Sequence, residues 1–292
     1  MSDRGRSFQA RLRSQSGPGA GLSLDCPSAP EFTFDAETFG IIIRRRLGWP
    51  LPLVPAFCEG CGAALDAQGD HRCACMRSGR VQLRARPLEQ AVAQICREAG
   101  ARVQLNARLC DMNVAVSAAD ERRVEVLASG VACFGGAQLA VDATLRSPLR
   151  CDGTPRPGAD RIDGIVLAEA ARDNRNRYRE IATGGRCRLI VVALETGGRF
   201  GQEAIDFIRQ MALARAQSAP RLLRQAAALA MERRWSRLIA CSAARVVAQS
   251  LVQEKPAFRV SAAAGPNRRE PWLGDVLAGA RRYLEMHSGV AG

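Results

Sequence analysis

The chain is poor in two side chains on which large classes of enzyme depend. Only one of its 42 basic residues is a lysine, Lys255, so a mechanism that requires a lysine has almost no candidate. Histidine occurs twice, at His71 and His287. Because metalloprotease helices and histidine-rich metal centres need histidine at several positions, those classes are excluded.

Long apolar segments are also missing. There is no uninterrupted run of about 18 apolar residues that could span a membrane, and the N-terminus lacks the apolar stretch of a secretory signal. We therefore expect an intracellular protein without a membrane partner. Residues 1–30 are rich in Arg, Ser, Gly and Pro, which predicts a disordered tail. An Arg-rich start is also compatible with an organelle transit peptide, although Asp3 and the Gly17-Pro18-Gly19 break argue against it.

Positive charge is what the chain has in excess. Its 292 residues are 47% hydrophobic, enough for a genuine core, and carry a formal net charge of +13. Such an excess indicates a polyanionic partner, with nucleic acid as the first expectation. Arginines that can contact phosphates without reading bases occur in three groups: Arg44, Arg45 and Arg46; Arg172, Arg175 and Arg177; and Arg233, Arg234 and Arg237.

Four of the eleven cysteines cluster in one short segment, where the spacing is Cys58-x2-Cys61-x9-His71-x3-Cys75. Thiolates and one imidazole in this arrangement are the ligands of a structural, tetrahedral Zn²⁺. Zinc binding could contribute on the order of 10 kcal/mol to the folding of a small module, which we place at residues 31–80. Cys73 could replace His71 or Cys75, because spacing alone does not fix the ligand set.

Hydrophobic periodicity predicts an α/β protein with a core at residues 81–200 and a helical extension at 201–292. The expected elements are a helix that starts at Pro87 and ends at Gly100, strands at 103–109, 124–127 and 139–142, a helix at 165–178, a strand at 189–194, and helices at 204–218, 221–252 and 272–286. The run 189–194 has no polar alternation, which favours a strand covered on both faces in the middle of a sheet.

Two acidic residues fall within the predicted strands, Glu125 and Asp142. Paired carboxylates can hold Mg²⁺ and so support phosphodiester hydrolysis, although such acids are more often solvated or paired with arginine. The glycine-rich segment 195–201 lacks the GK[ST] ending of a phosphate loop, so we expect it to be a turn that leads into the helix at Gln202, with Glu195 paired to an arginine.

Several segments together resemble a known family. They are the Cys58–Cys75 cluster with Gly69-Asp70-His71, and residues 95–100, 122–127, 139–144 with Ser147-Pro148, 194–198 and 234–235. In order and spacing, over roughly residues 35–250, they are similar to the C-terminal region of non-LTR retrotransposon proteins of protists. In that region a CCHC zinc knuckle precedes a restriction-like PD-(D/E)xK endonuclease.

The resemblance implies a restriction-endonuclease-like αβββαβ core. Glu125 would be the first acid that binds a catalytic Mg²⁺ or Mn²⁺ and Asp142 the second, with Glu89 assisting from the first helix. The family's lysine position corresponds to Asn174, and the alternative position two residues after Asp142 is Thr144. Neither side chain carries a charge, and a nearby arginine can stabilise a phosphate but hardly accepts a proton.

The resulting expectation is a retroelement-derived domain, nuclear in location, that binds DNA or RNA and nicks DNA weakly or no longer at all. The alternative is a catalytically dead nucleic-acid-binding or assembly module, which Asn174 favours.

Overall fold

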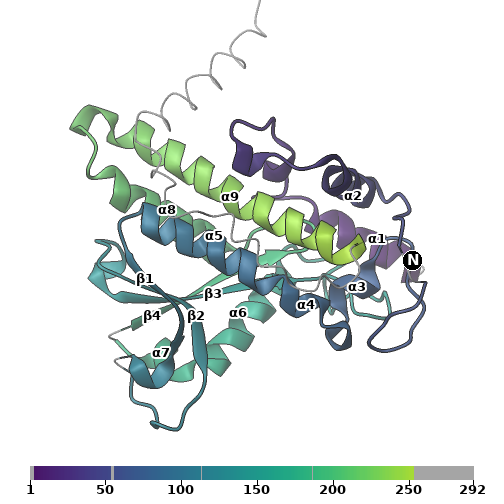
Figure 1. The fold of residues 1–292 in the computed structure, drawn as a ribbon, viewed down its shortest axis with the longest axis horizontal. Coiled ribbons are helices and arrows are strands. Elements are labelled where there is room, and N and C mark those ends of the chain that lie inside the picture. The colour runs from purple at the N-terminus through teal and green to yellow at the C-terminus, as the bar shows by residue number, and fades with distance from the viewer. Residues whose placement is uncertain (1–2, 54–55, 113, 186, 253–292) are drawn as a thin grey trace, which may run out of the picture.

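A computed structural model describes residues 3–53, 56–112, 114–185 and 187–252 (Figure 1). The helices are α1 (Asp3–Ser14), α2 (Ala36–Leu47), α3 (Asp70–Ala74), α4 (Arg80–Leu83), α5 (Ala85–Glu98), α6 (Ile165–Arg177), α7 (Arg179–Thr183), α8 (Gln202–Ala216) and α9 (Arg224–Val252). The strands are β1 (Arg102–Arg108), β2 (Arg123–Ser129), β3 (Gln138–Arg146) and β4 (Cys187–Glu195). The prediction of a mixed α/β fold is confirmed.

One four-stranded sheet organises the chain, in the order β1-β2-β3-β4. The first three strands form an antiparallel meander, whereas β4 pairs parallel to β3, with Asp142 opposite Val191. Parallel neighbours need a crossover connection, and α6 and α7 supply it between β3 and β4. The element order from α5 to β4 is therefore α-β-β-β-α-β, with the additional short helix α7 before β4, as the periodicity predicts.

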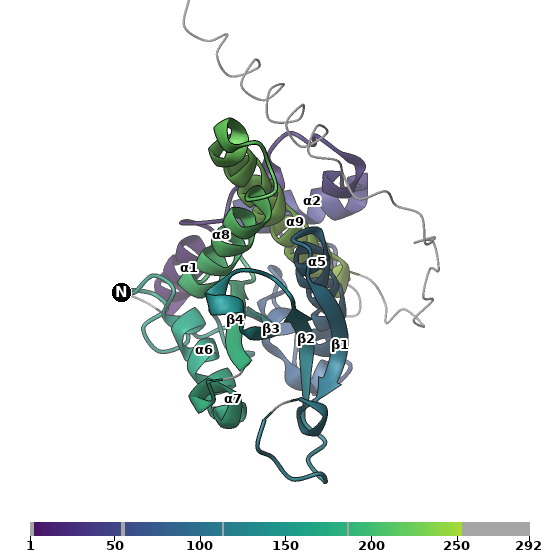
Figure 2. The same cartoon turned by 90° about the vertical axis from the view of Figure 1, so that its left-hand side faces the viewer.

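Helices cover both faces of the sheet (Figure 2). Alternate side chains of β4 divide between two clusters: Ile190, Val192 and Leu194 face α5, α8 and α9, while Leu189, Val191 and Ala193 face α6 and α7. The prediction that β4 is covered on both faces is confirmed. Its expected place in the middle of the sheet is wrong, because β4 is an edge strand whose two faces are buried by helices.

Helices α8 and α9 belong to the main core rather than to an appended extension. They pack against each other and against β4 and α5 (Figure 1). The Trp235 side chain of α9 is 1% exposed, and its indole N–H donates to Glu98 Oε2 of α5 at 2.6 Å. The further helix expected at 272–286 lies outside the described residues.

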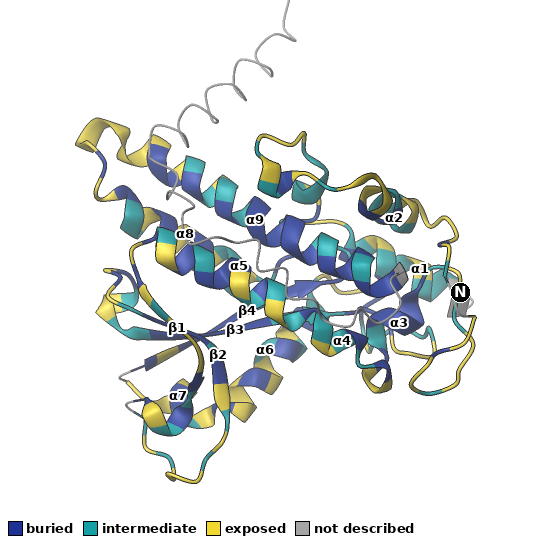
Figure 3. Ribbon diagram, viewed as in Figure 1, coloured by how far each residue is buried: buried dark blue, intermediate teal, exposed yellow. Residues whose placement is uncertain are grey.

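The disordered tail expected at residues 1–30 differs from the structure. Residues 3–14 form α1, several of whose residues are partly buried (Figure 3). Ala10 of this helix is fully buried. Arg6 pairs with Asp160 at 2.9 Å and Arg13 with Asp163 at 2.7 Å. These partners lie about 150 residues away in the chain, so the local composition of the segment could not reveal them.

The segment after β4 is a turn, as predicted. The Glu195 N–H donates to the Arg199 carbonyl at 2.9 Å, and α8 begins at Gln202. The N-terminal segment lies directly on this turn, since the Gly197 N–H donates to Ser14 Oγ at 3.0 Å. Within the described residues, no helix combines the length and the apolar character that a membrane crossing requires.

This contact predicts a strict need for glycine at position 197. An alanine Cβ there would lie 2.6 Å from the backbone oxygen of Ser14. We expect Gly197→Ala to lower the free energy of unfolding by about 1–3 kcal/mol through overpacking, as measured by urea denaturation. Gly21→Ala is the control, because nothing lies within 4 Å of its added Cβ. Equal stability of the two variants would contradict the observed docking of residues 14–20.

Candidate metal centre and carboxylate cluster

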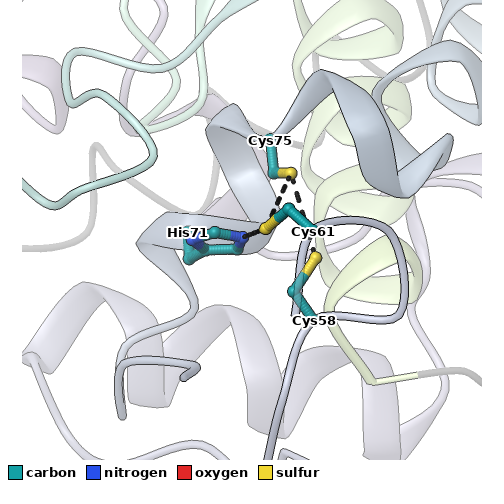
Figure 4. Close-up of side chains that lie close together, drawn as sticks. All are labelled: Cys58, Cys61, His71 and Cys75. Atoms are coloured by element: carbon teal, nitrogen blue, oxygen red, sulfur yellow. Dashed lines mark hydrogen bonds between the residues drawn. The ribbon is translucent and has the colours of Figure 1, made fainter. Parts of the chain in front are cut away.

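The four zinc ligands predicted from spacing converge (Figure 4). Their ligand atoms in Cys58, Cys61, His71 and Cys75 all lie within 4.8 Å of one another. The Cys75 sulfur is 3.8 Å from both other sulfurs, and Cys61 Sγ is 3.2 Å from His71 Nε2. A tetrahedral zinc with Zn–S bonds of about 2.3 Å separates its sulfurs by about 3.8 Å. The cluster can therefore hold a metal ion, and its geometry is compatible with structural zinc.

Hydrogen bonds fix the orientation of the one histidine in this cluster. Its Nδ1 lies 2.7 Å from the carbonyl oxygen of Cys151, which leaves Nε2 facing the sulfurs. The Asp66 carboxylate accepts the backbone N–H groups of Gln68, Asp70 and His71 at 2.7–3.0 Å and so shapes the start of α3. A carbonyl partner on the second imidazole nitrogen is the usual support of a metal-bound histidine.

The thiols in the cluster differ in acidity. Burial by itself would raise the pKa of Cys58, but N–H groups of Gly60 and Cys61 and the His71 side chain bring it down to about 6. Burial raises the pKa of Cys75. A thiol that ionises near neutral pH supplies the thiolate that a soft metal ion binds.

Cys73 is not part of the ligand group, which resolves the choice that spacing left open. Its side chain is 3% exposed and packs with Ile41, Leu51 and Leu251 in an apolar cluster. Its carbonyl oxygen accepts a hydrogen bond from Arg84 Nη1 at 3.0 Å.

Buried arginines join the metal centre to the end of α9, so the segment is not a separate small module. Arg84 Nε donates to Ser250 Oγ at 2.8 Å, and Arg80 Nη1 donates to the Ser250 carbonyl at 3.0 Å. Arg72, next to the ligand His71, donates to the Leu251 carbonyl. Cations at the last carbonyls of a helix stabilise its C-terminal end.

Zinc content and stability should follow the four ligands. We expect one zinc ion per purified chain by elemental analysis, and loss of that ion together with a lower melting temperature in Cys61→Ala. Cys73→Ala is the matched control, because it removes a neighbouring thiol that lies outside the ligand group. Retention of zinc by Cys61→Ala would refute this ligand assignment.

A second cluster consists of three carboxylates from three elements. Glu89 of α5 and Glu125 of β2 are half-buried, and Asp142 of β3 is 2% exposed. Burial is the main cause that raises the pKa of Glu125 to about 8, and the charge of Asp142 is the second. The same two causes raise the pKa of Glu89. Burial also raises the pKa of Asp142. The charge of Asp142 thus acts on both glutamates, and that of Glu89 acts on Glu125.

Hydrogen bonds hold two of these acids in place. Glu125 Oε2 accepts the Ala143 N–H at 2.6 Å, which ties β2 to β3 directly beside Asp142. The Thr144 hydroxyl donates to Asp142 Oδ2 at 2.8 Å and accepts from Asn174 Nδ2 at 3.1 Å. The two alternative lysine positions inferred from the sequence, 144 and 174, therefore meet at one point next to Asp142.

The carboxylates are less tightly gathered than the zinc ligands. Within the described part of the chain, the Cys58–Cys75 cluster is the only group of three or more His, Cys, Asp or Glu side chains whose ligand atoms converge as in a metal site. The charge of Arg177 lowers the pKa of both Glu125 and Asp142, and the charge of Arg146 lowers that of Asp142.

The arginines expected to bind nucleic acid occupy different environments. Arg45 donates to the Gln68 carbonyl at 2.6 Å and pairs with Asp70, and Arg46 donates to the carbonyls of Gln15 and Ala20. Arg44 is exposed and donates to the Pro50 carbonyl at 3.2 Å. The first group therefore largely serves internal contacts.

The arginines of α6 are all exposed, but only one is paired. Arg175 forms an ion pair with Glu203 at 2.7 Å. The guanidinium groups of Arg172 and Arg177 make no hydrogen bond or ion pair with the part of the chain that is described. Of the third group, Arg234 binds Glu31 and Glu98, and Arg237 is buried and donates to the Asp25 carbonyl at 2.6 Å.

The sequence did not reveal the groups that hold the site through hydrogen bonds to the backbone. The Asp66 carboxylate and the Cys151 carbonyl position His71, but every residue has a carbonyl, so the residue type at position 151 gives no indication of this role. The Tyr178 hydroxyl donates to the Arg123 carbonyl at 2.7 Å and fixes the end of α6 against β2. Only Asp66 had a usable signal, because an Asp shortly before a Gly-Asp pair is typical of a side chain that caps a turn.

The carboxylates predict how stability depends on pH in buffer without divalent ions. Glu125 ionises near 4.5 when unfolded and near 8 when folded, so the unfolded chain binds fewer protons between these values. Burial penalises the ionised carboxylate, so this penalty is absent below about pH 4.5 and is complete once the pH has risen through about 8. We expect the free energy of unfolding to fall over this window and Glu125→Gln to flatten the fall. Glu121→Gln, an exposed control, should keep it, and a fall unchanged in Glu125→Gln would contradict the assignment.

Comparisons with known proteins add no relative. No protein-family model matches the chain, and no curated protein matches it.

Proposed function

We propose that the protein is a restriction-like, metal-dependent nuclease domain of retroelement type, with weak DNA-nicking activity. The observation that carries the proposal is that Glu125 of β2 accepts the N–H of Ala143, next to Asp142 of β3, while the charge of Asp142 acts on both Glu125 and Glu89 of α5. These are the three elements from which the PD-(D/E)xK resemblance predicts its acids. The α-β-β-β-α-β order along the chain supports the same assignment.

The proposed chemistry is phosphodiester hydrolysis. Glu125 and Asp142 would hold a Mg²⁺ or Mn²⁺ ion, with Glu89 at the margin, and carboxylate oxygens suit both ions. Such an ion, when bound, supplies an activated water and stabilises the leaving oxygen. The raised pKa values of these acids mean that cation binding and deprotonation favour each other, so activity should increase with pH.

At the family's lysine position, the site has no group that can accept a proton. Where the family has a lysine, Asn174 and Thr144 form a neutral pair hydrogen-bonded to Asp142. An amide and a hydroxyl can orient a water molecule but cannot take a proton from it at neutral pH. We therefore expect slow cleavage rather than the rate of an intact site.

DNA binding is assigned mainly to α6. Arg172 and Arg177 have unpaired guanidinium groups there, in contrast to Arg45 and Arg46. Exposed cations of this kind bind backbone phosphates without reading sequence. The Cys58–Cys75 centre would hold zinc as a structural element, and a chromosomal DNA target would place the protein in the nucleus.

Nicking of supercoiled plasmid by zinc-loaded protein tests the proposal. We expect Mn²⁺- or Mg²⁺-dependent nicking that Asp142→Ala abolishes, and a gain of about 10-fold to 100-fold in Asn174→Lys, because this variant restores a cation beside Asp142. Asp206→Ala is the matched control, since it removes an exposed carboxylate of α8.

A catalytically dead nucleic-acid-binding module is the second candidate, and the neutral Asn174–Thr144 pair favours it. In that case, DNA binding should fall steeply with salt and be indifferent to Mg²⁺. Neither the wild type nor Asn174→Lys should then nick DNA.

A further inference from the structure

The C-terminal turn of α6 carries the observations for a further assignment. Asn174 and Arg177 lie three residues apart on one face of α6, and Tyr178 directly follows the last residue of the helix. Two of these residues have fixed contacts with the sheet: Asn174 reaches Asp142 through Thr144, and Tyr178 donates to the Arg123 carbonyl of β2. In the sequence, Arg177 lies between these two anchors.

The Arg177 side chain is directed by its neighbour. Its guanidinium carbon lies 5.1 Å from the centre of the Tyr178 ring, and the Tyr178 side chain is 1% exposed. Stacking on a buried ring restrains an arginine while leaving its N–H groups free. The guanidinium makes no hydrogen bond or ion pair with described residues, and its charge acts on both Glu125 and Asp142.

The neighbouring cations have other partners. Arg146 pairs with Asp173 at 2.6 Å, and Arg175 pairs with Glu203 at 2.7 Å. Arg172 is unpaired, but it lies two residues before Asn174, about 200° around the helix. Arg177 is therefore the unpaired α6 cation on the face that meets the acids.

We propose that Arg177 binds the phosphate group that the carboxylate cluster acts on, and so supplies the positive charge that the missing lysine leaves out. The planar guanidinium can donate two N–H groups to two phosphate oxygens, a geometry that suits a phosphodiester. It stays charged at every relevant pH, so it holds the substrate and offsets charge without transferring a proton. This assignment rests on the proposed nuclease function.

Two variants distinguish phosphate binding at the carboxylate cluster from the effect of the protein's net positive charge. Arg177→Gln removes the cation at the acids, and Arg209→Gln removes an exposed cation of α8. At saturating DNA and with Mn²⁺, we expect Arg177→Gln to lower the nicking rate by about 100-fold, as when a donor to a reacting phosphate is lost. Arg209→Gln should leave the rate at saturation unchanged. Arg177→Lys should recover part of the lost rate.

A binding experiment keeps the assignment testable if the nuclease function fails. Ca²⁺ replaces Mn²⁺, and the affinity for a duplex oligonucleotide is measured by fluorescence anisotropy with and without Ca²⁺. We expect Ca²⁺ to strengthen binding in the wild type and in Arg209→Gln, and this gain to disappear in Arg177→Gln. Loss of the gain in Arg177→Gln together with no nicking by the wild type or Asn174→Lys would refute the nuclease and support the phosphate site. Equal behaviour of Arg177→Gln and Arg209→Gln in both experiments would overturn the assignment.

Discussion

The parallel pairing of β3 with β4 is the constraint on which the candidate site depends. Because two parallel strands cannot be joined by a tight turn, the chain must cross over the sheet between them, and α6 lies on that crossover. The crossover brings Asn174 to Thr144 and Tyr178 to the backbone of β2. The acids of the antiparallel strands and the cations of α6 are therefore neighbours only because β4 runs parallel to β3.

Arginine performs two different tasks in this chain. In the interior it donates hydrogen bonds to buried oxygen atoms. Arg72 and Arg84 are among the largest fully buried side chains, and both donate to backbone or hydroxyl oxygens. A planar guanidinium has five N–H donors, so one buried arginine can bind several carbonyls that would otherwise lack partners. A large net charge is thus partly absorbed by the fold, whereas the guanidinium groups of Arg172 and Arg177 on α6 stay exposed, without a hydrogen bond or ion pair to described residues.

The metal centre and the carboxylate cluster place opposite demands on the fold. The cysteines and His71 gain from burial because a soft ion would neutralise their charge, and the surrounding arginines tie the centre to α9. Burial raises the pKa of the three carboxyl groups, and the charge of Asp142 raises those of Glu125 and Glu89 further, which makes the cluster a source of destabilisation above neutral pH when no cation is bound.

The sequence by itself determined what is local. The helix ending before Gly100, the strands around Glu125 and Asp142, the turn after Glu195 and the Cys58–Cys75 spacing follow from periodicity, glycine placement and short chelate loops. It did not reveal that residues 3–14 pack as α1, because the contacts of Arg6 and Arg13 lie about 150 residues away. Tertiary structure alone decided which cysteine is spare, which arginines are already paired, and that positions 144 and 174 meet at Asp142. Each of these depends on side chains brought together from distant segments, and such proximity has no counterpart in local pattern or composition.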